Sequence, residues 1–214
     1  MRKLLISFFL LSALLLSAQN YCSKSCAAFD KAISRLQIEN TAELEDITYL
    51  IANWVINPDM RYIAGNMHVR FRILVEAYDS LRLNLSDSLH VDSILFRGNR
   101  ANFRHIHEKL SIDLPGLIPN DTAGLVIYYQ GVPASSGFGS FVQTSTPYGK
   151  PIIWTLSQPF GASDWWPCKE SFADKIDSSD YYINIPLGNR AAGIGRLIRS
   201  EEHTSELQSP CNLV

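Results

Sequence analysis

The stretch Met67-His-Val-Arg-Phe-Arg-Ile-Leu-Val75 decides the fold class. Apolar residues stand at every second position of it: Met67, Val69, Phe71, Ile73 and Val75. The residues between them are mostly polar or charged, and successive side chains of a β-strand point to opposite faces of the sheet. The stretch therefore predicts a strand of an antiparallel sheet, with one face against a core and the other against water.

The neighbouring sequence predicts more strands of this kind. A run from Ile47 to Ile56 precedes a second run from Met60 to Val75, and Asn57-Pro58-Asp59 between them favours a turn, so the two runs predict a hairpin. We expect further strands at residues 81–85, 91–96, 110–114, 125–130, 141–144, 152–156 and 181–185. Because turns rather than helical crossovers separate them, the expected fold is mostly β, an antiparallel β-sandwich rather than a parallel α/β fold.

Composition limits the classes of function. The chain has 214 residues, a net charge of −2, 46% hydrophobic and 19% charged residues, which is the balance of a globular protein rather than of a disordered or collagen-like one. No basic excess is present to neutralise phosphates, so we expect no nucleic-acid partner. Without an internal repeat or a linker-like change in composition, residues 41–198 are expected to form one domain.

The N-terminus has the pattern of a secretory signal peptide. Met1-Arg2-Lys3 carries two positive charges, an apolar run follows from Leu4 to Leu16, and Ser17-Ala18 offers small residues for cleavage. The 13 residues of the apolar run are too few for a helix to cross a hydrocarbon core of roughly 30 Å. We therefore expect residues 1–18 to be removed, the protein to be periplasmic or secreted, and no permanent membrane span.

Residues 19–40 are expected to form a short N-terminal helix and a linker. Cys22, Cys26, Phe29, Ile33 and Leu36 recur at helical spacing. In a regular helix, Cβ atoms four residues apart are separated by about 6 Å, whereas a disulfide needs roughly 3.5–4.5 Å. Apolar packing of the two cysteines is therefore favoured, and a bridge formed by an unwound helix end is the alternative.

The C-terminal residues 199–214 have a sequence that is unusual for a natural protein. The run Arg199-Ser-Glu-Glu-His-Thr-Ser-Glu-Leu-Gln-Ser209 resembles the in-frame translation of a sequencing-library adapter, and Asn212-Leu213-Val214 matches the continuation of the same adapter. We therefore expect residues 199–214 to be an artefactual tail and the natural sequence to run to about Ile198.

Between the two ends of the chain, two features could form a binding site for a metal or a sugar. His105-Ile106-His107 could place two imidazoles on one strand face, but no third ligand is indicated by spacing, so exposed strand histidines are expected and no metal site. An aromatic-rich loop contains Trp165 and Trp166, which could stack on a sugar or pack against protein. Packing is the favoured interpretation.

An ordered set of motifs in this region resembles a known family. The run Trp154-Thr-Leu-Ser-Gln-Pro159 is followed by Gly161-Ala162, Trp166-Pro-Cys-Lys-Glu170, Lys175 and a strand that ends at Pro186. Upstream stand Asn57-Pro-Asp59, Arg61-Tyr-Ile-Ala-Gly65 and Ser135-Ser-Gly-Phe-Gly-Ser-Phe141. Together they resemble the N-terminal domain of aminopeptidase N-like zinc metallopeptidases (gluzincins), in the secreted bacterial branch, over roughly residues 47–198.

The resemblance implies a saddle-like β-sandwich that packs on a separate catalytic domain in the same polypeptide. In that family the catalytic domain holds zinc through a His-Glu-x-x-His helix and a distal Glu, and zinc lowers the pKa of the attacking water. This sequence contains no such motif. We therefore expect the truncated N-terminal domain of a zinc aminopeptidase, with zinc bound by the full-length parent, no catalytic residue in this chain and no activity of the chain alone.

The resemblance also assigns residues. In the family, a Glu or Gln at the end of the strand before the aromatic loop hydrogen-bonds the free α-amine of the peptide substrate, and the matching residue is Gln158. Trp165, Trp166 and Cys168 are expected at the interdomain contact, with exposed aromatic surface. The alternative from another class is a free-standing secreted β-sandwich that binds carbohydrate on Trp165 and Trp166, or binds protein.

Overall fold

The structure is a computed structural model that describes residues 44–136, 139–158, 160–171 and 175–201. The predicted signal peptide at residues 1–18, the predicted helix at residues 19–40 with Cys22 and Cys26, and residues 202–214 of the predicted artefactual tail lie outside the described residues. None of the helices in the described ranges is both long and apolar enough to span a membrane.

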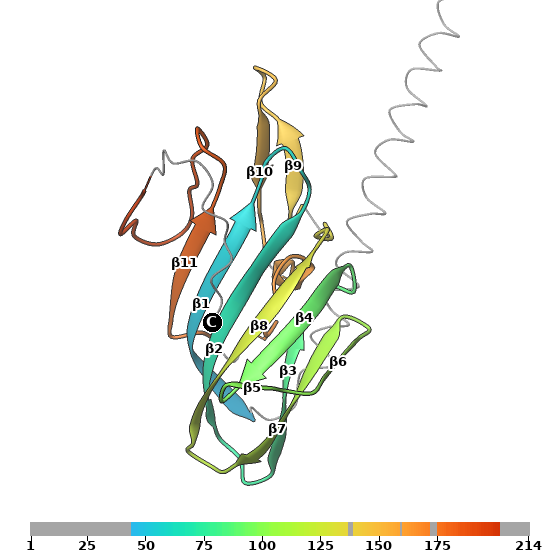
Figure 1. Cartoon of the computed structure of the whole chain (residues 1–214), viewed down its shortest axis with the longest axis vertical. Helices are drawn as coiled ribbons and strands as arrows, with labels where there is room; N and C mark the ends of the chain where they lie inside the picture. Colours follow the sequence, from blue (N-terminus) through green and yellow to red (C-terminus); the bar gives the residue numbers. More distant parts are fainter. Residues whose placement is uncertain (1–43, 137–138, 159, 172–174, 202–214) are drawn as a thin grey trace, which may run out of the picture.

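Strands make up most of the described chain and form three sheets (Figure 1). A six-stranded sheet has the order β11-β1-β2-β8-β4-β5, a three-stranded sheet has the order β3-β7-β6, and a two-stranded ribbon consists of β10 and β9. The strands are β1 (Glu45–Ile56), β2 (Ile63–Ile73), β3 (Tyr78–Asn84), β4 (Leu89–Phe96), β5 (Asn99–Arg100), β6 (Phe103–Ile106), β7 (Lys109–Leu117), β8 (Thr122–Gly131), β9 (Val142–Ser145), β10 (Pro151–Trp154) and β11 (Ser178–Asn184).

The predicted hairpin is confirmed as β1 and β2, which pair in antiparallel register from Glu45 opposite Ile73 to Ile56 opposite Ile63. The second strand begins at Ile63 rather than at Met60. Met60 donates its backbone N–H to the Asn57 carbonyl at 3.0 Å, and Tyr62 donates to the Met60 carbonyl at 2.9 Å, so these residues belong to the turn.

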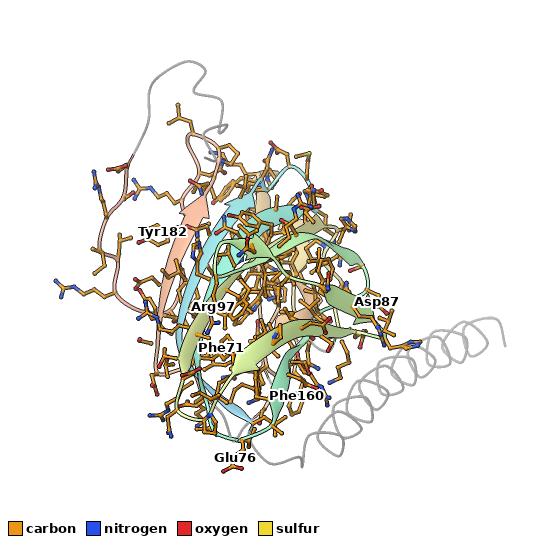
Figure 2. The ribbon with its side chains drawn as sticks, turned by 60° about the horizontal axis from the view of Figure 1, so that its bottom comes forward. Phe71, Glu76, Asp87, Arg97, Phe160 and Tyr182 are labelled. Carbon is orange, nitrogen blue, oxygen red and sulfur yellow. The ribbon has the colours of Figure 1, made fainter. Side chains whose placement is uncertain are left out.

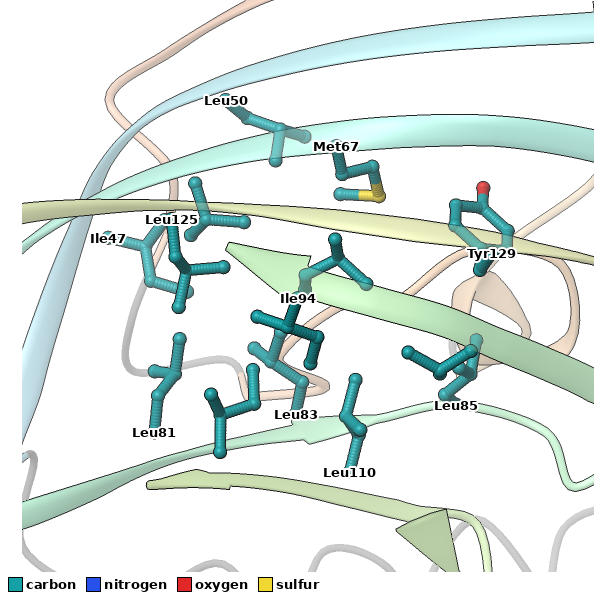
Figure 3. Close-up of a cluster of buried hydrophobic side chains, with 14 of the residues drawn as sticks. Ile47, Leu50, Met67, Leu81, Leu83, Leu85, Ile94, Leu110, Leu125 and Tyr129 are labelled. Carbon is teal, nitrogen blue, oxygen red and sulfur yellow. The ribbon is translucent and has the colours of Figure 1, made fainter. Parts of the chain in front are cut away.

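The six-stranded sheet packs its inner face against the three-stranded sheet, and the core lies between them (Figure 3). The alternation in β2 is confirmed, because its apolar residues between Met67 and Ile73 are at most 3% exposed while His68, Arg70 and Arg72 face solvent. Leu50 and Ile94 of the large sheet and Leu83 of the small one are each about as buried. The predicted mostly-β sandwich is confirmed, with one parallel pair among the described strands, β1 and β11.

The two histidines do not share a strand face. β6 ends at Ile106, and His107 and Glu108 have φ angles of 51° and 59°, which form the turn into β7. The expectation of exposed strand histidines is wrong for His105, whose side chain is 12% exposed and whose Nε2 lies 3.0 Å from the Leu85 carbonyl. The tight turn ends the strand before the second imidazole.

The packing between the sheets makes a stability prediction. Leu83 is 1% exposed, so Leu83→Ala leaves a cavity and should lower the free energy of unfolding by about 2–5 kcal/mol, measured by urea denaturation of the chain. Ile118→Ala is the control, because Ile118 is 63% exposed and should change the stability by only about 0.5 kcal/mol. Equal effects of the two variants would contradict the assigned core.

Candidate functional site

The candidate site is the loop that follows β10, residues 155–171, called here the aromatic loop. Among its described residues, 155–158 and 160–171, one turn of 3₁₀-helix spans Ala162–Asp164, an isolated bridge joins the loop to β3, and no other helix or strand is present. At that bridge the backbones of Asn84 and Cys168 exchange hydrogen bonds of 2.7 and 3.0 Å. Ser86 also donates its backbone N–H to the Ser163 carbonyl at 2.8 Å. The aromatic loop is therefore tied to the end of the small sheet.

Trp165 anchors the loop to the large sheet. Its ring lies 4.8 Å from that of Trp54 on β1 and 6.0 Å from that of Phe141, and the residue is 8% exposed. Trp54 Nε1 donates to the Tyr129 hydroxyl at 2.9 Å, and that hydroxyl donates to the Trp165 carbonyl at 3.3 Å. Burial raises the pKa of Tyr129, so its hydroxyl keeps its proton and acts as this donor.

Asp164 fixes the loop to the segment before β9. Its side chain is almost fully buried, with 1% of the residue exposed. One carboxylate oxygen accepts from the Ser136 backbone N–H at 2.9 Å and from the hydroxyls of Ser136 and Ser140. The Asp164 carbonyl accepts from the Ala134 backbone N–H at 3.0 Å. These donors compensate the cost of burying a carboxylate.

A second buried carboxylate closes the other half of the loop. Glu170 is 7% exposed and accepts from the Ser163 backbone N–H at 3.2 Å and from the Ser163 hydroxyl at 2.8 Å. Neither Asp164 nor Glu170 was predicted as a site residue from the sequence. The sequence shows the serines that serve as donors, but their pairing with these carboxylates depends on how the folded chain brings them together.

Gln158 lies at the exposed tip of a fixed turn. The Gly161 backbone N–H donates to the Ser157 carbonyl at 2.7 Å, and the Ser157 hydroxyl accepts from Trp165 Nε1 at 3.1 Å. A Cβ atom at Gly161 would lie 2.7 Å from the Ser140 Cβ, so the close approach of the turn requires glycine. In the described part of the chain, the Gln158 side chain has no hydrogen-bond partner and faces solvent.

The structure places the other predicted site residues inside the domain. Trp165 and Cys168 are 8% and 6% exposed, and Trp166 is half-buried with edge contacts to Trp54 and Trp165 at 6.3 and 6.1 Å. The expectation of exposed aromatic surface is therefore wrong for Trp165, because Trp54 and Phe141 cover its ring. Sugar stacking, which needs an open ring face, is not favoured. The interdomain role of Trp165, Trp166 and Cys168 stays a prediction.

The described residues do not fit a zinc ion. No group of three or more His, Cys, Asp or Glu side chains in the described ranges is arranged to hold a metal. Asp164 and Glu170 already accept hydrogen bonds from serine residues. The site can position a polar side chain, Gln158, on a rigid loop, and we derive no metal-dependent step from this chain.

The Asp164 contacts make a second stability prediction. Asp164→Asn replaces the charged acceptor of three hydrogen bonds by a neutral, weaker one, so the free energy of unfolding should fall by about 2 kcal/mol or more in urea denaturation. The matched control is Asp92→Asn, whose carboxylate accepts from the Gln130 amide at the surface and should cost about 0.5 kcal/mol or less. An unchanged midpoint for Asp164→Asn would contradict the anchoring role.

Comparison with known proteins places this fold. No protein-family model matches the sequence, and no curated protein is significantly similar to it. Among solved structures, a two-domain M1 zinc metallopeptidase bound to L-arginine has a TM-score of 0.67, 21% identity, and coverage of 76% of this chain and 38% of its own. The M1 zinc metallopeptidase from Deinococcus radiodurans has a TM-score of 0.66 and 21% identity, and the match covers 75% of this chain and 37% of that one. Leukotriene A4 hydrolase from Saccharomyces cerevisiae has a TM-score of 0.55 and 19% identity, and the match covers 67% of this chain and 24% of that one.

The chain spans little more than a third of the length of the first of these structures. The matched part is the N-terminal domain region of the metallopeptidases. This chain therefore has the fold of the N-terminal domain of M1 zinc metallopeptidases.

Proposed function

We propose that this chain serves as the N-terminal domain of an aminopeptidase-like zinc metallopeptidase, which removes residues from the N-termini of peptides. Zinc and the catalytic groups would belong to a further domain of the same protein. The fold match supports this proposal, since it covers 76% of this chain but 38% of the two-domain enzyme. The observation that carries it is the exposed Gln158 on a fixed turn, at the position that the resemblance implies for contact with the substrate amine.

The chemistry of Gln158 suits that role. Its carbonyl oxygen can accept a hydrogen bond from the α-ammonium of a peptide, although less strongly than a carboxylate would. The hydrogen bonds of Ser157 fix the backbone beside it, so only the side-chain torsions of Gln158 remain to be ordered when a ligand binds. Gln158 would therefore bind and orient the substrate while the chemical step takes place on the other domain.

The experiment begins with the protein encoded at the full genomic locus, where we expect a His-Glu-x-x-His motif downstream and zinc-dependent release of an aminoacyl reporter. Gln158→Ala should lower kcat/KM by about 10–100-fold, because a hydrogen bond to a charged group is lost. Gln158→Glu should retain or raise kcat/KM, since a carboxylate accepts more strongly.

The control for these variants is Asn99→Ala on β5, at the far edge of the large sheet, which should leave kcat/KM unchanged. The 214-residue chain alone should release no reporter, with or without zinc. Zinc-dependent release by that chain, or a locus that encodes no zinc-binding domain, would refute the proposal.

We further propose that the protein is exported to the periplasm or beyond. The charged start and the apolar run from Leu4 to Leu16 support this. In a bacterial host, mass spectrometry should find an extracytoplasmic protein that begins at Gln19. Leu10→Arg, which interrupts the apolar run, should leave the precursor uncleaved, whereas Ser7→Ala should be processed normally. Normal processing of Leu10→Arg would refute the proposed signal.

A further inference from the structure

One edge of the six-stranded sheet is formed by β11, which pairs with β1 without a shift in register (Figure 1). In the ranges that the structure describes, the backbone of β11 hydrogen-bonds to no segment other than β1. Residues 185–201 follow β11 and contain no helix or strand. One side of this seven-residue strand therefore presents unpaired N–H and C=O groups.

The other edge strands in the described part of the chain are short, bulged or covered. β5 has two residues, and β6, β9 and β10 have four each. β4 is covered by β5 at one end only, but its register with β8 shifts between Val91 and Ser93. β3 also has a register shift, and its last residue, Asn84, is bridged to Cys168. Proteins prevent pairing of edges by such features and by lysine or proline, and β11 has none of them.

The two faces of β11 limit how a second β11 could pair with it. Tyr181 stacks on Trp54 with ring centroids 5.5 Å apart, and Ile183 packs against the core, so both lie on the inner face. Asp180 and Tyr182 alternate with them and lie on the outer face. A two-fold axis perpendicular to the sheet keeps each face on its own side. Inner residues then lie opposite inner ones, which requires the antiparallel pairing to be centred on a residue.

A centre at Tyr181 suits this sequence. Tyr181 is the middle residue of β11, so all seven residues of each copy find partners, from Ser178 opposite Asn184 onward. Asp180 then lies opposite Tyr182 of the other copy, and the two Tyr181 side chains form an aromatic cross-strand pair, which is favourable. A centre at Asp180 would place two carboxylates directly opposite each other, which is unfavourable.

We propose that β11 is a self-association surface whose partner is β11 of a second copy of this chain, antiparallel and centred on Tyr181. The six-stranded sheets of the two copies join into one continuous sheet. Tyr181 and Tyr182 are 37% and 56% exposed in one copy, and the second copy covers part of both. Because one strand pair is a small interface, the dimer dissociates on dilution. This inference does not depend on the proposed function.

Light scattering of the 214-residue chain over a range of concentrations tests the association. At high concentration we expect twice the 24.0 kDa mass of one chain. Tyr182→Asp places a carboxylate opposite each Asp180 of the dimer, so the dissociation constant should rise about tenfold. Tyr182→Lys places an ammonium group there instead and should leave the dissociation constant unchanged or lower it.

The matched control is Tyr148→Asp, the same substitution at a tyrosine that is 92% exposed in the turn between β9 and β10. It should dimerise like the wild type. Because Tyr148 and Tyr182 are both exposed, all three variants should unfold at the same urea concentration as the wild type when measured at low protein concentration.

Hydrogen exchange locates the contact. The β11 N–H groups that point away from β1 should exchange more slowly at high protein concentration, and Tyr182→Asp should remove this difference. A chain that stays monomeric, a dimer that Tyr182→Asp leaves intact, or one that Tyr182→Lys dissociates would overturn the proposal. Protection of these groups at every concentration alike would also overturn it, because another segment of the same chain would then occupy the edge.

Discussion

The hydrogen-bonded path from Trp54 through Tyr129 to the Trp165 carbonyl links the large sheet to the aromatic loop. The loop has no ladder of its own, so its position depends on contacts with the sheets around it. The Tyr129 hydroxyl both accepts and donates in the core, and Trp165 packs over Trp54. Through Ser157, which accepts from Trp165 Nε1, this path reaches the turn that carries Gln158.

Two buried carboxylates, those of Asp164 and Glu170, also hold the aromatic loop in place. An irregular segment that enters a core brings backbone groups that need partners, which is why loops usually stay at the surface. Here Asp164 receives the donors of Ser136 and Ser140, Glu170 receives those of Ser163, and Asn84 pairs with the Cys168 backbone. The loop therefore acts as part of the sandwich, and a side chain at its tip can be held in a defined place.

The strands could be predicted from the sequence because their signal is local. The alternation from Met67 to Ile73 corresponds directly to the buried and exposed faces of β2. The path of the aromatic loop could not be predicted, because Trp165 is covered by Trp54, which is remote in the sequence. For the same reason the sequence suggested an exposed Trp165. The substrate-binding role of Gln158 is implied only by a resemblance of motifs and stays a prediction, and the fixed turn beneath it depends on contacts that the sequence does not show.

The parallel pairing of β1 with β11 also affects how the chain folds. β1 is the first strand of the described domain and β11 the last, and Tyr49 lies opposite Ser178. One edge of β1 therefore stays unpaired during synthesis until the final strand has emerged, while β2 already pairs with its other edge. Such open edges can pair with other chains, and contacts between distant residues slow folding. In the folded domain β11 forms this edge of the sheet, and Tyr182 lies on it (Figure 2).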